Sequence, residues 1–211
     1  MDYSKLAFIR MAIDDGALRF GRFTLKSGRI SPYFFNAALF YSGNSLKILG
    51  EYYANTLLQN KIQFQHLFGP AYKGFAIATA TAIALSNHQI NCTVTFNRKE
   101  HKDHGEGGML IGAPLTNGDT ILIDDVISAG TAFRESQKFI IQHGGTLTGV
   151  LIALDRCERG ISQKSTIDEI KDQKIAVFSI ITVYDLLAYL YQENDIHSVK
   201  QIETYLDDQG A

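Results

Sequence analysis

The sequence predicts an α/β protein with a mainly parallel sheet flanked by helices. From about residue 60 to residue 182, short apolar segments alternate with longer amphipathic ones, a pattern typical of a parallel sheet covered by helices on both faces. Hydrophobic residues make up 45% and charged residues 20% of the 211 residues. This is the composition of an ordinary globular domain that is long enough to bury a core.

The N-terminal part predicts two helices and a hairpin. Leu46, Leu49 and Tyr53 recur at spacings of three or four residues, which indicates an amphipathic helix. Lys26 to Arg29 contains a Ser-Gly pair typical of a tight turn. The elements predicted here are a helix at 4–14, strands at 20–25 and 30–36, and a helix from Ser42 or Asn44 to about Asn60.

The rest of the chain predicts the sheet. The expected strands are 66–68, 92–96, 120–124, 146–154 and 175–181, the helices between them are 74–86 and 131–143, and two further helices follow at 183–192 and 196–206. Ligands of such sheets bind beyond the carboxyl ends of the strands. The loops that start at Gly69, Asn97, Asp124 and Asp155 are therefore the candidate binding loops.

Charge and cysteine usage exclude several classes of protein. The chain has 20 Lys+Arg against 22 Asp+Glu, a net charge of −2, so no global attraction to nucleic acid or to a membrane is expected. No signal peptide is recognisable, and polar residues interrupt the uncharged stretch 74–97, so we expect a cytoplasmic protein without a membrane span. Cys92 and Cys157 are isolated, which argues against a disulfide framework or a zinc site.

The strongest local signal is the segment 120–132. An apolar strand ends in Asp124 and Asp125, and a run of small residues then leads into a helix. Backbone N–H groups and hydroxyls at such a helix start can hold a phosphate, and two adjacent acids suit ribose hydroxyls or a magnesium ion. The alternative is a plain strand-to-helix turn with solvated acids.

This segment resembles the phosphoribosyl pyrophosphate (PRPP) motif of the type I phosphoribosyltransferases. Other segments, in the same order along the chain, resemble the orotate phosphoribosyltransferase family within that group: 23–29, 31–36, 69–74, 97–107 and 154–156. The resemblance covers nearly the whole chain. It implies one Rossmann-like domain, 1–211, with an N-terminal hood (about 1–59), a PRPP-binding core (about 60–182), C-terminal helices (183–211) and a flexible lid loop.

The resemblance also implies the site residues. PRPP would be bound by Lys26, Tyr72, Lys73, Arg98, Lys99, Lys102, His104, Asp124, Asp125, Val126, Ile127, Ser128, Ala129, Gly130, Thr131 and Ala132. Orotate would be bound by Phe34, Phe35, Ser128 and Arg156. The catalytic groups among them would be Lys73, Lys99, Lys102, His104, Asp124 and Asp125. Ser128 stands where threonine is the more familiar residue of this family.

Several of these residues also have a physical reading of their own. Residues 98–106 carry three cations and three carboxylates beside glycines, which fits either a mobile lid over pyrophosphate or a solvated hairpin. Lys73 at a helix start opposes the helix dipole unless an anion is bound, although a lysine on the surface is the alternative. Phe34 and Phe35 should face opposite sides of a strand, so at least one should leave the core, unless both are simply packing residues.

The implied reaction is orotate plus PRPP to orotidine 5′-monophosphate plus pyrophosphate, a step of UMP biosynthesis. Mg²⁺ would be held mainly by PRPP, with help from Asp124 and Asp125, and the family implies a homodimer with shared active sites. Two alternatives remain: a phosphoribosyltransferase for another base, and a PRPP-binding regulator without activity. Arg156 favours a carboxylated base, whereas a regulator should carry a nucleic-acid-binding domain, which this chain lacks.

Overall fold

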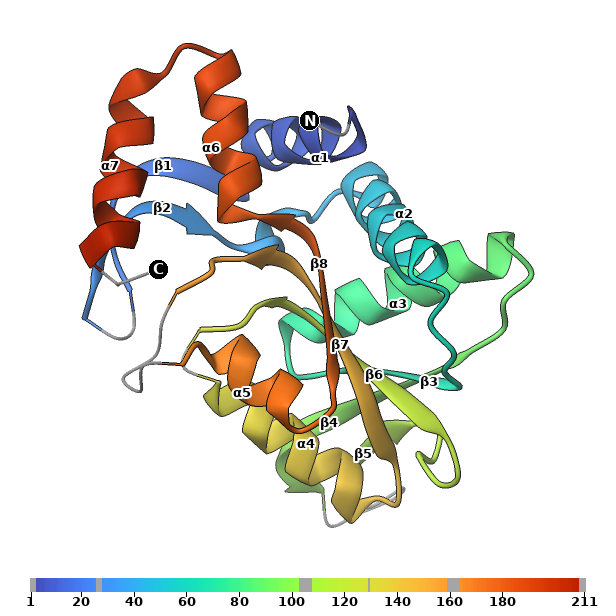
Figure 1. The fold of residues 1–211 in the computed structure, drawn as a ribbon. Coiled ribbons are helices and arrows are strands. Elements are labelled where there is room, and N and C mark those ends of the chain that lie inside the picture. Colours follow the sequence, from blue (N-terminus) through green and yellow to red (C-terminus); the bar gives the residue numbers. More distant parts are fainter. Residues whose placement is uncertain (1–2, 26–27, 103–107, 129, 159–163, 209–211) are drawn as a thin grey trace.

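A computed structural model describes residues 3–25, 28–102, 108–128, 130–158 and 164–208 (Figure 1). The helices are α1 Tyr3–Asp14, α2 Gly43–Gln59, α3 Lys73–Asn87, α4 Thr131–Gln142, α5 Thr166–Asp172, α6 Val183–Gln192 and α7 Ile196–Asp208. The strands are β1 Leu18–Thr24, β2 Ile30–Phe35, β3 His66–Gly69, β4 Thr93–Lys102, β5 Gly108–Gly112, β6 Asp119–Val126, β7 Thr146–Asp155 and β8 Ala176–Thr182, and a short 3-10 helix spans Ala37–Leu39.

The expected mainly parallel sheet is present. Within the described residues six strands lie in the order β5-β4-β3-β6-β7-β8, and only β5 runs antiparallel to its neighbour. Successive residues of β6 enter different cores: Ile121 and Ile123 face one side of the sheet and Leu122 the other. Both faces are therefore buried, which explains the uninterrupted apolar sequence of this strand.

Helices cover the two faces in separate layers. On one face α3 packs against β3, β4 and β6, and α2 packs on α3, β7 and β8; the other core contains Phe133 of α4 and Ile170 of α5 (Figure 1). At the crossing of α2 and α3, a Cβ added to Gly50 would lie 2.4 Å from the carbonyl oxygen of Ala80. Glycine is thus required for the close approach of these helices. Helix α2 is part of the layer over the sheet, although the sequence grouped it with the hood.

A second unit stands beside the sheet edge. Strands β1 and β2 form an antiparallel hairpin, and β2 contacts α7 while α1 contacts α6 (Figure 1). The C-terminal helices therefore complete the hood that the sequence assigned to the N-terminal segment alone. Among the helices described, none is long and apolar enough to cross a membrane.

Two of the candidate binding loops, those that follow β3 and β6, leave neighbouring strands of the sheet. Strands β3 and β6 are parallel neighbours, yet the chain passes from β3 to β4 on one side and from β6 to β7 on the other. The strand order reverses between them, and ligands of open α/β sheets bind in the crevice expected at such a point.

Strand β5, helix α5 and the 3-10 helix at Ala37–Leu39 were not predicted, and β4 extends further than expected. Strand β5 pairs with β4, with Asn97 opposite Leu110 and Lys102 opposite Gly108, so residues 98–102 lie in a strand and not in the expected loop. Backbone pairing with β5 overrides the charged composition of this segment; residues 103–107 lie outside the described residues. Helix α5 was not predicted either, although its capping box of Ser165 and Asp168 is a recognisable start signal.

Candidate active site

Lys73 and Asp125 form an ion pair at the crevice between β3 and β6. The Nζ atom of Lys73 lies 2.7 Å from Oδ2 of Asp125, whose side chain is 6% exposed. The same Oδ2 accepts the backbone N–H of Ala37 at 3.3 Å, and Oδ1 accepts that of Val126 at 3.0 Å. The carboxylate of Asp125 therefore balances the charge of Lys73, which would otherwise oppose the positive end of the dipole of α3.

Asp124 has a different environment from its neighbour. Its Oδ1 accepts the N–H of Asp125 at 2.8 Å, and its carbonyl oxygen accepts the hydroxyl of Tyr53 at 2.7 Å. Burial, followed by the negative charge of Asp125, raises the pKa of Asp124 from 3.8 to about 7. The charged form of Asp124 is thus disfavoured, and a hydroxyl donor or a cation from a ligand would stabilise it.

The loop after β3 brings Tyr72 and Lys99 together. The Nζ atom of Lys99 lies 4.8 Å from the centre of the Tyr72 ring, and Tyr72 is 65% exposed. The backbone N–H of Ala71 donates to Oδ1 of Asn97 at 2.9 Å, which fastens this loop to β4. Tyr72, Lys73 and Lys99 therefore share one side of the crevice.

Helix α5 supports the predicted phosphate loop. The Thr166 hydroxyl donates to the carbonyl oxygen of Ser128 at 2.9 Å. Gly130 has φ +74°, and a Cβ there would lie 2.5 Å from Cγ2 of Thr166, so the loop can turn tightly against α5 only with glycine at this position.

The N-terminus of α4 is open to a ligand. No described side chain caps it, and both Thr131 and Ala132 are exposed. The N–H groups of a first helical turn have no partner within the helix, so an anion can bind to those of α4. Val126 and Ile127 line the approach as half-buried residues.

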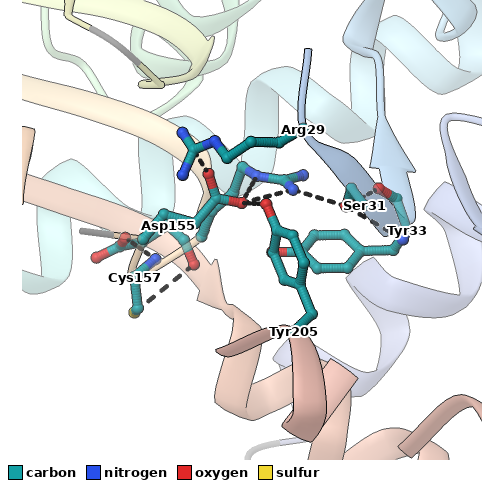
Figure 2. A network of polar contacts seen from close by, with 8 residues as sticks. Arg29, Ser31, Tyr33, Asp155, Cys157 and Tyr205 are labelled. Carbon is teal, nitrogen blue, oxygen red and sulfur yellow. Dashed lines mark hydrogen bonds and ion pairs between the residues drawn. The ribbon is translucent and has the colours of Figure 1, made fainter. Parts of the chain in front are cut away.

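Arg156 lies buried in a network of polar contacts that follows β7. Its Nε donates to Oε1 of Glu158 at 2.7 Å and its Nη2 to Oγ of Ser31 at 2.9 Å. The guanidinium carbon lies 4.2 Å from the centre of the Tyr33 ring, and Figure 2 shows Arg29, Ser31, Tyr33 and Tyr205 converging here. Burial opposes the charged form, but Tyr33 and Glu158 outweigh it, so the pKa of Arg156 is raised and the cation is retained.

The two aromatic residues of β2 separate as expected. Phe35 is 3% exposed and packs with its ring centre 6.4 Å from Phe8 and 6.2 Å from Phe40. Phe34 is half-buried and stacks on Phe23 at 5.5 Å. The ring of Phe35 therefore packs in the core, and of the two rings that of Phe34 is the one placed to cover a flat base; the binding of orotate by Phe34 and Phe35 stays a prediction.

The remaining predicted residues are only partly described. Lys26, His104 and Ala129 lie outside the described residues, as does the side chain of Lys102. Arg98 lies in β4, and its Nε is buried without a hydrogen-bond partner among the described residues.

Sequence reasoning missed several supporting residues. Thr166, Tyr53 and Ala37 contact predicted residues that are 38, 71 and 88 positions away in the sequence, and Tyr205 contacts Glu158 from 47 positions away. No local pattern signals these four residues. Glu158 at least lies next to a predicted residue, two positions beyond Arg156.

Magnesium fits this site only as an ion shared with a substrate. Within the described part of the chain, no group of three or more His, Cys, Asp or Glu side chains could hold a metal. Mg²⁺ often binds through one or two carboxylates together with substrate phosphates. Asp124 and Asp125 can provide that number, and Asp124 is the freer of the two.

The fold and this arrangement define a class of protein. A parallel sheet with an acidic pair at its switch point, an uncapped helix start beside it and a lysine opposite is the arrangement of a type I phosphoribosyltransferase. No protein-family profile matches the sequence. Curated relatives, however, identify the family within that class.

The chain is 59% identical over 211 residues to the orotate phosphoribosyltransferase of Legionella pneumophila (strain Lens), covering 100% of both chains. It is 53% identical over 191 residues to that of Proteus mirabilis (strain HI4320), covering 90% of this chain and 89% of the relative. The crystal structure of orotate phosphoribosyltransferase from Francisella tularensis superposes with a TM-score of 0.87 at 36% identity, covering 100% of this chain and 99% of that one. The chain belongs to the orotate phosphoribosyltransferase family.

Proposed function

We propose that this chain transfers the 5-phosphoribosyl group of PRPP to orotate, giving orotidine 5′-monophosphate and pyrophosphate for pyrimidine biosynthesis, at the crevice described above. One observation carries the location. Val126 at the end of β6 is paired with Leu154 of β7, so Arg156 follows the strand beside the one that bears Asp124 and Asp125. A carboxylate-binding group and a ribose-binding group thus start from adjacent strand ends.

The PRPP half of the site combines three parts. The first turn of α4, with the hydroxyls of Ser128 and Thr131, receives the 5′-phosphate. Asp124 and Asp125 accept hydrogen bonds from the ribose hydroxyls, and Lys73 faces the pyrophosphate. Lys99 and Tyr72 lie on the same side as Lys73. We assign Lys26, Arg98, Lys102 and His104 to the same anion.

The orotate half depends on Arg156. A guanidinium binds a carboxylate through charge-assisted hydrogen bonds, and we assign the Nη1 side of Arg156, which the described contacts with Glu158 and Ser31 leave open, to the carboxylate of orotate. The half-exposed ring of Phe34 covers the base, while the hydroxyl of Ser128 borders both substrates.

The chemistry is a displacement without an enzymic nucleophile. The base enters as an anion, its ring nitrogen bonds to the anomeric carbon, and the bond from that carbon to the pyrophosphate oxygen breaks. Positive charge on the sugar is stabilised by Asp124 and Asp125, and negative charge on the leaving group by Lys73, Lys99, Lys102 and His104. When bound to PRPP, Mg²⁺ supplies further neutralisation of the pyrophosphate.

We further propose a homodimer in which Lys99, Lys102 and His104 of one chain complete the PRPP pocket of the other. On substrate binding Lys99 would then exchange its contact with Tyr72 of its own chain for the pyrophosphate held by the partner. An apolar groove of about 580 Å³ runs along α2 and α3, and Ile83 on α3 is 62% exposed. A symmetric second copy would cover this face and exclude water from the crevice. The cytoplasmic location stays a prediction.

The test is the release of pyrophosphate from PRPP on addition of orotate. We expect turnover with orotate and none with adenine, hypoxanthine or uracil at the same concentration. Turnover with a purine in place of orotate would support the phosphoribosyltransferase for another base. PRPP binding without turnover of any base would support the regulator.

A further inference from the structure

The C-terminal helix reaches the base side of the site through one hydrogen bond. Tyr205 of α7 donates its hydroxyl to Oε1 of Glu158 at 2.7 Å, and the same oxygen accepts Nε of Arg156 at 2.7 Å. Tyr205 is 7% exposed and lies edge-on to Tyr33, with ring centres 6.4 Å apart. Figure 2 shows Tyr205 and Tyr33 side by side in this network.

Glu158 is held by donors from separate parts of the fold. Its side chain is 6% exposed; Oε1 faces Arg156 Nη2 at 2.6 Å, and Oε2 faces Arg29 Nη2 at 3.5 Å. Oε2 has no hydrogen bond among the described residues, so Oε1 carries the directional contacts. The hydroxyl of Tyr205 and the guanidinium of Arg156 therefore set the rotation of this carboxylate together.

The position of Arg156 depends in turn on this carboxylate. Glu158 accepts a hydrogen bond from Nε of Arg156 and forms an ion pair with Nη2, which also donates a hydrogen bond to Ser31. These contacts fix the plane of the guanidinium over the ring of Tyr33. Among the described residues these contacts leave the N–H groups of Nη1 for a ligand carboxylate, and the plane of the guanidinium sets the direction of those N–H groups. A residue that fixes the position of Glu158 therefore also fixes the geometry with which Arg156 binds a carboxylate.

We propose that Tyr205 and Glu158 are positioning residues for Arg156, so that helix α7 sets the affinity of the enzyme for orotate. The inference rests on the role proposed above for Arg156. Two arginines surround one carboxylate here, so the cluster keeps one positive charge for a carboxylated ligand. Helix α7 is thereby part of the substrate site and not only a packing element.

The test is Tyr205→Phe, with Tyr191→Phe as the matched control. Tyr191 also donates to a glutamate, Glu203, at 2.8 Å, but this pair lies on the exposed face of α6 and α7. We expect Tyr205→Phe to raise the KM for orotate roughly 3- to 10-fold, the effect of one lost hydrogen bond, with the KM for PRPP unchanged. Tyr191→Phe should change neither KM.

Two further variants keep the inference falsifiable. Glu158→Asp withdraws the carboxylate by one methylene while keeping its charge, and should likewise raise the KM for orotate without changing the KM for PRPP. This variant provides the test if Tyr205→Phe folds poorly. Arg156→Lys tests the underlying assignment: if it leaves the KM for orotate unchanged, the role of Arg156 is wrong and the inference falls with it. If Arg156→Lys raises that KM but Tyr205→Phe and Glu158→Asp do not, Arg156 binds orotate without help from α7 and the inference is overturned.

Discussion

The Nζ atom of Lys73 lies 2.7 Å from Oδ2 of Asp125, so the first residue of α3 is paired with the end of β6 across the point where the strand order reverses. The two groups have opposite tasks in the proposed reaction, one toward pyrophosphate and one toward ribose. In the absence of substrate, each of these two charges is balanced by the other: the buried carboxylate of Asp125 by Lys73, and the lysine at the start of α3 by Asp125. In the proposed complex, PRPP exchanges this contact for two new ones.

Asp125→Asn should fold normally and lose turnover by at least about 100-fold, because the amide keeps the shape of the side chain but not the charge. Lys73 is 43% exposed and can be solvated once unpaired. The amide can accept only one of the two backbone N–H groups, of Ala37 and Val126, that the carboxylate accepts, so the variant should remain folded with a lower melting temperature. Asp119→Asn, at the opposite end of the same strand, is the control and should keep full turnover. Unchanged turnover in a folded Asp125→Asn protein would show that the sugar-binding role is wrong.

Asp124→Asn should lose turnover as well, but should stabilise the fold in a pH-dependent way. The folded pKa of Asp124 is about 7 against an ordinary value of 3.8. As the pH rises from about 4 to 7 the unfolded chain loses this proton before the folded one does, so the wild type loses stability over that window. The variant lacks this loss. Its melting temperature should exceed that of the wild type at pH 8 and approach it at pH 4.

Arg156→Lys should weaken the use of orotate and leave PRPP binding nearly untouched. A lysine cannot present two parallel N–H groups, and the loss of one charge-assisted hydrogen bond costs roughly 1.5 to 3 kcal/mol. Steady-state kinetics with each substrate varied in turn measure this. An equal loss for both substrates would contradict the assignment.

Thr166→Val should raise the KM for PRPP several-fold, because the hydroxyl that holds the carbonyl of Ser128 is lost while the volume of the side chain is kept. Thr166→Ser keeps the hydroxyl and should resemble the wild type. If Ser is the more harmful replacement, the packing of the Thr166 methyl group against Gly130 matters more than the hydrogen bond.

Mixed dimers should recover activity that neither parent shows. Lys102→Ala lacks a group of the lid and Asp125→Asn a group of the pocket, each inactive alone in the proposed dimer. In a mixed dimer the pocket of the Lys102→Ala chain meets the intact hairpin of the Asp125→Asn chain, which restores one complete site. The measurement is turnover after co-refolding, with native mass spectrometry to show that mixed dimers form.

Inactive mixed dimers would mean that the β4–β5 hairpin serves its own chain. Dimers of each variant alone, refolded in the same way, are the control for refolding losses. The shared-site proposal would then be dropped while the single-chain assignments remain.

Most of the fold could be predicted from local sequence. The apolar run 120–124, the glycines and the amphipathic spacing of α2 specify strands and helices through local sterics and burial. They place Asp124, Asp125 and Lys73 at strand or helix ends, where a parallel sheet gathers its ligands. Strand β5 could not be found in this way, because its pairing with β4 depends on a partner and not on its own composition.

The supporting contacts were decided only by the tertiary structure. That Lys73 meets Asp125, that Thr166 holds the phosphate loop and that Tyr205 reaches Glu158 depend on segments 52, 38 and 47 residues apart. Likewise, alternation along β2 required one of Phe34 and Phe35 to face inward, but only the packing of Phe8 and Phe40 selected Phe35. Residue type and local periodicity determine which groups reach the edge of the sheet, whereas the packing of distant elements determines which of them touch.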